Sequence, residues 1–365
     1  MRAPAVIAAI GTILIGALRI WHDEAVDSPA SDSLCAEYVG PAFIITDESR
    51  ATIATRAGSM TDVTFFSLDT GHADGTRIPV RQPLLAASTR QATGTLLLAL
   101  SEAGGVRISS FDLTQRGKNS TEFFDHIEAR LAVFARNGND LFGVTEKGLI
   151  FKIDILQGKV ETLEVAATKA SSLAVSQNGA RLYVAGMGLI SVDTKSLRIE
   201  SQLTGEPDLL EVSASPDGHT LALRNLQSIE LFDLAKTSGG GAVTSTVVDP
   251  MPNGASSSTI GRLAFGSDGS NLFYIKASEP GPELLSLSAN DLRVLARMPI
   301  GPRPTAIAIV PDRGWILLTA GHSGQESLVA VDIKTQKVVF ESALSGSSSA
   351  AKTESVTCSK VHKGM

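Results

Sequence analysis

The chain has 365 residues, of which 43% are hydrophobic and 19% charged, and its net charge is −6. This composition supplies enough apolar side chains for a folded core and excludes a globally disordered chain. The acidic balance argues against a general nucleic-acid binder, which would carry a basic field. Two cysteines exclude a disulfide-rich scaffold and a cysteine-rich zinc site.

The N-terminal segment has the pattern of a targeting sequence. Arg2 precedes an apolar or small-residue run from Ala5 to Leu18. This run matches the core of a secretory signal and is shorter than the ~20 residues that span a bilayer. Residues 1–30 are therefore expected to be a signal peptide, or a hydrophobic anchor helix that tethers the chain to a membrane through residues 3–21. Both interpretations place the remainder in the periplasm or outside the cell, whereas a buried N-terminal helix would not.

An apolar residue followed by Asp recurs along the chain at intervals of 39 to 44 residues, with one interval of 55. The pairs, one with Ser for Asp, are Leu68-Asp69, Phe111-Asp112, Ile153-Asp154, Val192-Asp193, Phe232-Asp233, Leu287-Ser288 and Val331-Asp332. The long interval contains a Gly- and Ser-rich insertion. The spacing predicts seven units of about 40 residues, a period typical of repeat architectures.

A second marker lies in phase with the first. It consists of the turn dipeptides Asn137-Gly138, Asn178-Gly179, Asp217-Gly218 and Asp268-Gly269, each between two short apolar runs. Such dipeptides supply the positive φ that tight hairpins require, so they need no catalytic explanation. The Asp of the first marker is expected to end a strand and to accept backbone N–H groups in a turn.

The fourth unit displays the whole plan, with strands expected at 173–176, 181–185, 189–193 and 198–203. Four short antiparallel strands, repeated seven times, predict an all-β, seven-bladed β-propeller of four-stranded blades. We expect one propeller domain over residues 31–358 and a flexible C-terminal tail over 345–365. The expected blades are approximately 42–82, 83–126, 127–166, 167–203, 204–256, 257–300 and 301–344.

Several segments resemble known repeats. Leu182 to Ala185 followed by Ile190 to Thr194, and Leu328 to Asp332, resemble the YVTN-type repeat, and Ser215 to Gly218 is similar to a turn shared with WD-repeat proteins. The resemblance covers about 42–344, although the Trp-Asp dipeptide of true WD repeats is absent. It implies a bacterial, often secreted propeller of a group that includes lactonase-like enzymes, amine dehydrogenase large subunits and surface-layer-type binding proteins. A fold shared by such different proteins does not define an activity.

The two cysteines flank the predicted ring. Cys35 precedes the first blade and Cys358 follows the last, and a propeller brings its chain ends together. In an oxidising compartment we expect a Cys35–Cys358 disulfide. The alternative is two unpaired thiols in the terminal segments.

Polar residues in the connections between blades, and in the loops between second and third strands, are the candidate ligand site, because propellers usually bind ligands where these segments meet the central channel. The candidates are Arg81, His126, Glu128, Glu206, Arg262 and Arg303 in the connections and His322 in a loop. Further polar residues in the loops between second and third strands are Glu102, Glu146, Lys147, Arg224, Lys276, Glu279 and Glu326. Converging Arg81, Arg262 and Arg303 would favour a carboxylate or phosphate. Ordinary solvated loop charge is the alternative.

Sequence motifs for cofactors are lacking. The six histidines have no metal-ligand spacing, and no Cys-x-x-Cys, calcium loop or Gly-x-Ser-x-Gly sequence occurs. We therefore expect no cofactor and no metal. His126 beside Asp125 or Glu128 is the one local cluster that hints at acid–base chemistry.

The pattern predicts an exported, non-catalytic binding or scaffold propeller that presents loops to an envelope protein or small ligand, with no nucleic-acid partner. The alternative is an enzyme or enzyme large subunit. The amine dehydrogenase-like version needs a small cofactor-carrying partner, and the lactonase-like version needs a metal.

Overall fold

The structure, a computed structural model, describes residues 43–46, 50–57, 60–90, 93–112, 117–165, 169–204, 208–234, 242–248, 263–276, 281–300, 304, 306–322 and 325–344. All belong to one unit, Tyr38–Met365. The expected N-terminal helix and the Cys35–Cys358 pair lie outside these residues. Within the described ranges, no helix is long and apolar enough to cross a membrane.

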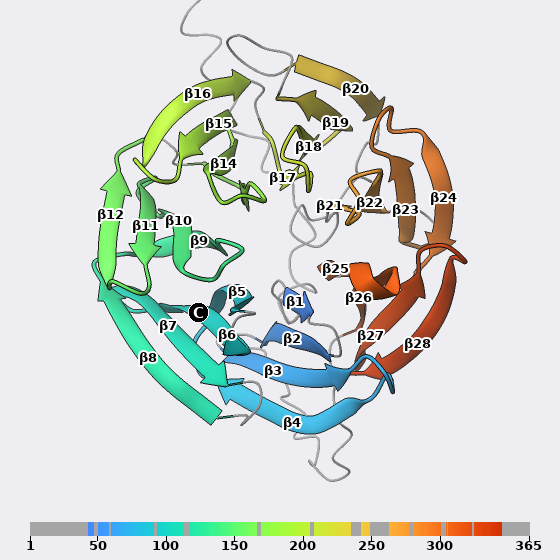
Figure 1. The fold of residues 1–365 in the computed structure, drawn as a ribbon, viewed down its shortest axis with the longest axis horizontal. Coiled ribbons are helices and arrows are strands. Elements are labelled where there is room, and N and C mark those ends of the chain that lie inside the picture. The colour runs from blue at the N-terminus through green and yellow to red at the C-terminus, as the bar shows by residue number, and fades with distance from the viewer. Residues whose placement is uncertain are drawn as a thin grey trace, which may run out of the picture. The chain divides into compact units, whose positions relative to one another are not determined.

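The described strands form seven antiparallel sheets of four consecutive strands each (Figure 1). Blade 1 consists of β1 (Phe43–Thr46), β2 (Arg50–Ala57), β3 (Met60–Ser67) and β4 (Ala73–Val80), and blade 2 of β5 (Leu84–Arg90), β6 (Thr95–Glu102), β7 (Gly105–Asp112) and β8 (Gly117–Asp125). Blade 3 consists of β9 (Ala129–Phe134), β10 (Asp140–Thr145), β11 (Ile150–Asp154) and β12 (Lys159–Leu163), and blade 4 of β13 (Ser172–Val175), β14 (Arg181–Gly186), β15 (Gly188–Asp193) and β16 (Arg198–Thr204). Blade 5 consists of β17 (Glu211–Ala214), β18 (Thr220–Arg224), β19 (Ser228–Asp233) and β20 (Ala242–Val248). Blade 6 consists of β21 (Leu263–Phe265), β22 (Asn271–Lys276), β23 (Glu283–Ser288) and β24 (Val294–Pro299), and blade 7 of β25 (Ala306–Val310), β26 (Trp315–His322), β27 (Gln325–Asp332) and β28 (Lys337–Ala343).

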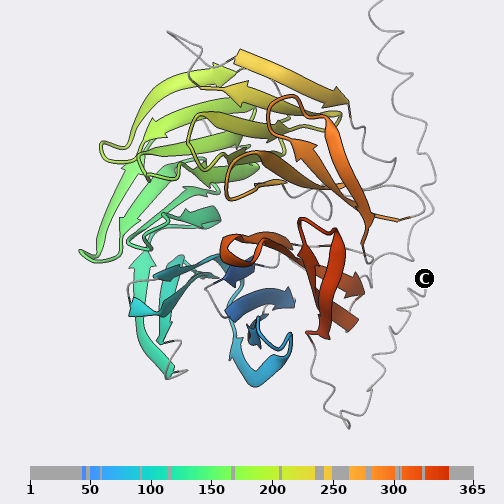
Figure 2. The same ribbon diagram turned by 45° about the vertical axis from the view of Figure 1, so that its right-hand side comes forward.

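The seven sheets form a closed ring. The first strand of each blade lies innermost and contacts the first strand of the next, and β25 of the last blade contacts β1 of the first. Figure 2 shows the twisted sheets stacked beside one another around this ring. The predicted all-β, seven-bladed propeller of four-stranded antiparallel blades is therefore confirmed.

The core consists of layers between blades. Seven buried clusters of hydrophobic residues occur among the described residues, and each joins two neighbouring blades. Between blades 4 and 5, for example, Tyr183 and Leu189 pack with Leu221 and Phe232. Each sheet thus buries its faces only by stacking on its neighbours, which is why the ring must close.

The Asn-Gly and Asp-Gly dipeptides form the turns between first and second strands. The glycines have positive φ, for example 71° at Gly179 and 73° at Gly218. The residue before each glycine has ordinary φ, and its side chain accepts a backbone N–H two residues later. Asn178 accepts from Ala180 N at 3.0 Å, and Asp217 accepts from His219 N at 3.0 Å. The dipeptide therefore needs left-handed backbone only at the glycine.

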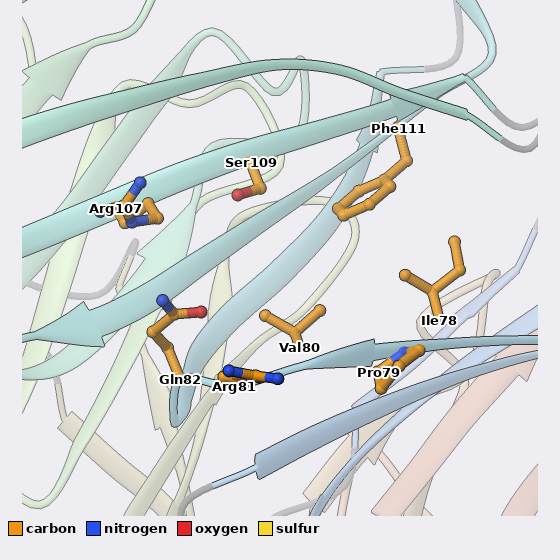
Figure 3. Close-up of a pocket in the computed structure, with 8 residues that line it drawn as sticks. All are labelled: Ile78, Pro79, Val80, Arg81, Gln82, Arg107, Ser109 and Phe111. Carbon is orange, nitrogen blue, oxygen red and sulfur yellow. The ribbon is translucent and has the colours of Figure 1, made fainter.

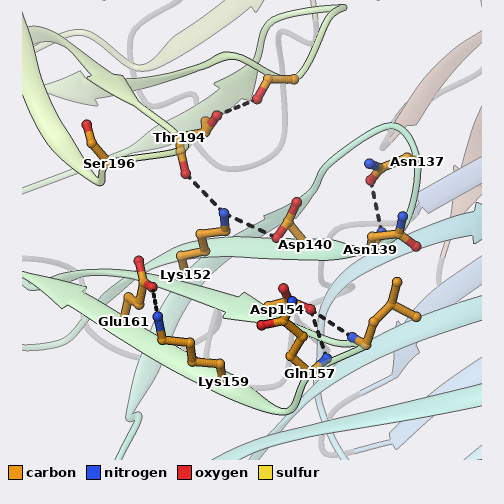
Figure 4. A network of polar contacts seen from close by, with 12 residues as sticks. Asn137, Asn139, Asp140, Lys152, Asp154, Gln157, Lys159, Glu161, Thr194 and Ser196 are labelled. Atoms are coloured by element: carbon orange, nitrogen blue, oxygen red, sulfur yellow. Dashed lines mark hydrogen bonds and ion pairs between the residues drawn. The ribbon is translucent and has the colours of Figure 1, made fainter.

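The Asp residues that end the third strands of blades 3, 4 and 7 act as predicted, since each accepts backbone N–H groups in the turn that follows. Asp154 Oδ1 accepts the backbone N–H of Leu156 at 3.0 Å and of Gln157 at 2.9 Å (Figure 4). In the five blades whose turn is described, the chain adopts positive φ four residues after the strand end, at Gly71, Gly158, Leu197, Leu292 and Gln336. In blade 1, however, the third strand ends at Ser67, so Leu68-Asp69 lies two residues beyond the position of the other pairs.

Polar side chains connect neighbouring blades across their interfaces. Lys152 of blade 3 donates to the Thr194 carbonyl of blade 4 at 3.1 Å and lies 3.4 Å from Asp140 (Figure 4). Similar bridges run from Arg90 Nη2 to the Gly138 carbonyl, from Arg130 Nη2 to the Ala170 carbonyl and from Val212 N to Ser172 Oγ. These hydrogen bonds fix the lateral position of one blade on the next, which apolar contacts alone do not specify.

Blade 7 closes on blade 1 through a guanidinium. Arg313 donates to the Leu68 carbonyl at 3.2 Å and pairs with Asp69. Its guanidinium carbon lies 5.1 Å from the ring centroid of Trp315, so the aromatic ring holds the cation in place. The closure therefore adds a charged contact to the apolar layer between the two blades.

Candidate functional site

A pocket lies between blades 1 and 2, lined by Ile78, Pro79, Val80, Arg81, Gln82, Arg107, Ser109 and Phe111 (Figure 3). We call it the blade 1–2 pocket. Its volume of about 370 Å³ falls in the lower part of the ~300–1,000 Å³ range of small-molecule sites. Of the sequence candidates whose side chains the structure describes, Arg81 alone lines it.

The two walls follow from strand geometry. Arg107, Ser109 and Phe111 alternate along β7, so they project from one face of the sheet toward blade 1. Val106 and Ile108 project from the opposite face, where they join the buried cluster shared with blade 3. The other wall is the end of β4 and its connection to β5, which carries Arg81 and Gln82.

The guanidinium of Arg107 is held from two sides. Its Nη2 donates to Glu102 Oε1 at 2.6 Å, and its Nε donates to Glu102 Oε2. The guanidinium also lies 5.7 Å from the ring centroid of Phe123. The hydrogen bonds lower the pKa of Glu102 and raise that of Arg107, so both groups are charged at neutral pH.

Arg81 has a different environment. Its side chain is exposed and makes no hydrogen bond or ion pair to another described residue. Five N–H donors of Arg81 therefore face solvent or a ligand. Sequence reasoning selected Arg81 but missed Arg107, Ser109 and Phe111, although the two-residue alternation of β7 places these three on one face.

The structure places His126 and Glu128 away from this pocket. His126, at φ 59°, lies in the connection between β8 and β9, and its Nε2 is 3.3 Å from Asp125 Oδ2. Both side chains of this pair are mostly exposed, 93% for His126 and 74% for Asp125, so water screens their interaction. The Glu128 carbonyl accepts the backbone N–H of Glu146 at 3.0 Å.

Arg224 is a structural residue. It is 4% exposed, and its Nε lies 3.4 Å from Glu211 Oε2 in the same blade. The other oxygen of Glu211 accepts Leu263 N of blade 6 at 2.8 Å. The polar-loop interpretation is therefore wrong for Arg224, because the side chain folds inward to link two blades.

The remaining candidates are not described at side-chain level. Glu206, Arg262 and Arg303 lie outside the described residues, so the expected convergence of Arg262 and Arg303 with Arg81 stays a prediction. His322 ends β26, and its side chain is outside the described part.

A second hollow of about 420 Å³ lies among the turns of blades 4 and 5. Its charged groups already have protein partners. Arg181 Nε pairs with Glu200 Oε2 at 2.8 Å, and Asp217 accepts Ser215 Oγ and His219 N. The hydrogen bond from the Ser215 hydroxyl is the largest cause of the lowered pKa of Asp217. These contacts serve the fold.

The chemistry of the blade 1–2 pocket follows from its lining. Among the described residues, the lining contains two guanidiniums, an amide and a hydroxyl, and no carboxylate or imidazole. Guanidinium stays protonated, so none of these side chains can act as a general base toward Ser109. Nowhere in the described ranges do three His, Cys, Asp or Glu side chains gather as a metal site.

Comparisons with known proteins agree with this architecture. No protein-family model and no curated protein matches the sequence. Hydrazine synthase from Kuenenia stuttgartiensis superposes with a TM-score of 0.62 at 15% identity, covering 84% of this chain and 99% of that chain. The β-propeller domain of Cps50 (Swd1) from Myceliophteria thermophila superposes with a TM-score of 0.62 at 11% identity, covering 82% and 98%. At these identities the likeness is one of fold, so the chain is a seven-bladed β-propeller.

Proposed function

We propose that this chain is an exported binding or scaffold propeller of the cell envelope, which holds a protein or small ligand without transforming it. The observation that carries the proposal is the blade 1–2 pocket. It has the volume of a ligand site and two cationic side chains, and none of its described lining residues could accept a proton from a nucleophile. A rigid ring of stacked sheets loses little conformational entropy when its pocket is filled.

Export is supported by the N-terminal targeting pattern over residues 1–30 and by the YVTN-type resemblance. A Cys35–Cys358 disulfide would suit the same compartment, since disulfides persist where the environment is oxidising. Under this proposal the propeller works in the periplasm or outside the cell, either free or tethered through residues 3–21.

The test is affinity capture of the tagged full-length chain from its native host in mild detergent. Mass spectrometry and metal analysis then identify what co-purifies. We expect an envelope protein without a redox cofactor, or a small ligand, at near one-to-one stoichiometry. A small cofactor-carrying subunit, or a stoichiometric metal with hydrolytic turnover, would contradict the proposal and support the enzyme alternative.

A further inference from the structure

The blade 1–2 pocket is polar at one end and apolar at the other. Figure 3 shows Arg107 and Gln82 facing each other across one end, and Phe111 and Ile78 at the opposite end. Val80 and Phe111 are 9% and 5% exposed and belong to the buried layer between blades 1 and 2, so the apolar end is a fixed wall. A ligand that fills this pocket has one polar group and one hydrocarbon part.

The polar end has a net charge of about one positive unit. Glu102 neutralises Arg107 and uses two of its five N–H donors, while Arg81 contributes a guanidinium without a partner among the described residues. A monoanion balances this charge. The planar fork of a guanidinium matches a carboxylate in particular.

The apolar end distinguishes among anions. An inorganic anion such as phosphate or sulfate would leave the partly exposed Ile78 facing water. A neutral apolar molecule would leave the Arg81 and Arg107 donors unsatisfied, or would displace water from them without replacing its hydrogen bonds. A carboxylate on a short hydrocarbon chain satisfies both ends.

We infer that the blade 1–2 pocket binds a carboxylate carried on a short apolar group, a ligand class that deepens the proposed binding function and rests on it. Two sources offer this chemistry, a free medium-chain carboxylic acid and the C-terminus of a partner chain that ends in an apolar residue. Arg81 binds the carboxylate, Arg107 orients it, and Phe111 with Ile78 contacts the hydrocarbon.

The experiment is calorimetric titration of the full chain with octanoate, and with 1-octanol and acetate as ligands that lack one end. Octanoate is expected to bind at least tenfold more tightly than either. Arg81→Gln removes the unpaired charge and keeps a polar side chain of similar reach, and should weaken octanoate about tenfold, the scale of one charged hydrogen bond.

Arg136→Gln is the matched control, because Arg136 is an exposed arginine in a turn of blade 3 away from the pocket. It should leave octanoate affinity within twofold of wild type. Ile78→Ser tests the apolar end at a partly exposed position and should reduce the advantage of octanoate over acetate. Thermal unfolding of each variant checks that it is folded.

A short peptide ending in Leu, with a free or an amidated C-terminus, separates the two sources. If the free-acid peptide displaces octanoate and the amidated peptide does not, the source is a partner's C-terminus. If octanoate binds and neither peptide displaces it, the source is a free acid. Both outcomes support the inference. Equal affinity for octanoate and octanol, no binding by any carboxylate, or equal loss in Arg81→Gln and Arg136→Gln would overturn it. In that case affinity capture would still test the binding or scaffold function, because a partner can bind elsewhere on the propeller. The failure of the carboxylate inference can therefore be distinguished from the failure of the proposed function.

Discussion

Gly71→Ala tests the closure of the ring. Gly71 lies in the turn between β3 and β4, with φ +68°, and its N–H donates to the Ser67 carbonyl at 2.9 Å. A methyl group on its α-carbon would lie 2.7 Å from Cγ of Phe340, which belongs to β28 of blade 7. The substitution therefore strains both the turn and the contact that joins the last blade to the first.

The expected cost has two parts. A non-glycine residue in left-handed backbone costs roughly 1–2 kcal/mol. Forcing a methyl group into a packed interface costs roughly 1–3 kcal/mol more. The free energy of unfolding should therefore fall by about 2–5 kcal/mol in Gly71→Ala.

Gly158→Ala is the matched control. Gly158 occupies the same turn position in blade 3 at φ +63°, but nothing lies within 4 Å of a methyl group there. It should lose only the backbone part, roughly 1–2 kcal/mol. The difference between the two variants therefore measures the blade 7 contact alone.

Urea denaturation followed by tryptophan fluorescence provides the assay, because Trp315 lies 6.1 Å from Phe340, centroid to centroid, at this closure. Adding Phe340→Leu to Gly71→Ala should recover part of the loss, as expected for residues in direct contact. Equal losses in Gly71→Ala and Gly158→Ala would refute the assignment of Phe340 to the closing contact.

Three further predictions concern charge and covalent closure. Hydrogen bonds lower the pKa of Asp217 in the fold, so its contribution to stability is present above the unfolded-state pKa of about 3.9 and is lost as pH falls through the folded value. Asp217→Asn should keep the turn, because Asn178 makes the same two hydrogen bonds in blade 4. In acid titrations monitored by circular dichroism, the variant should lose less stability than wild type as the pH falls through this range. Arg313→Gln removes the hydrogen bond to the Leu68 carbonyl and the ion pair with Asp69, and should lower the free energy of unfolding in urea by about 1–3 kcal/mol. An unchanged free energy would show that Arg313 does not stabilise the closure of blade 7 on blade 1. The mature protein should migrate differently on a gel with and without reductant if Cys35 and Cys358 are bonded, and identical migration would contradict that pairing.

The fold could be predicted because its signals are local. The short apolar runs, the Asn-Gly and Asp-Gly turns and the Asp at the end of third strands each act within a few residues of the chain. In the fourth unit the expected strands agree with β13, β14, β15 and β16 to within one residue at each end. The third strand of blade 1 could not be placed in the same way, because it ends at Ser67 and not at Asp69. Asp69 instead pairs with Arg313 of blade 7.

The pocket could not be predicted in the same way, because it depends on contacts between blades. The sequence shows that Arg107 and Phe111 share one face of a strand, but not that this face meets the β4 end beside Arg81. Arg224 illustrates the converse error. It was expected in a loop, yet it is the last residue of β18 and is buried against Glu211, with which it pairs across the sheet.

Native mass spectrometry of the full chain captured from its own host tests the central claim, that the blade 1–2 pocket is a ligand site, most directly. Wild type and Arg81→Gln are compared after identical capture, with Arg136→Gln as the control. The account predicts a one-to-one complex with a carboxylate-bearing ligand or partner in wild type and Arg136→Gln, and mostly bare chain in Arg81→Gln. Bare chain in all three, or equal occupancy in all three, would contradict it.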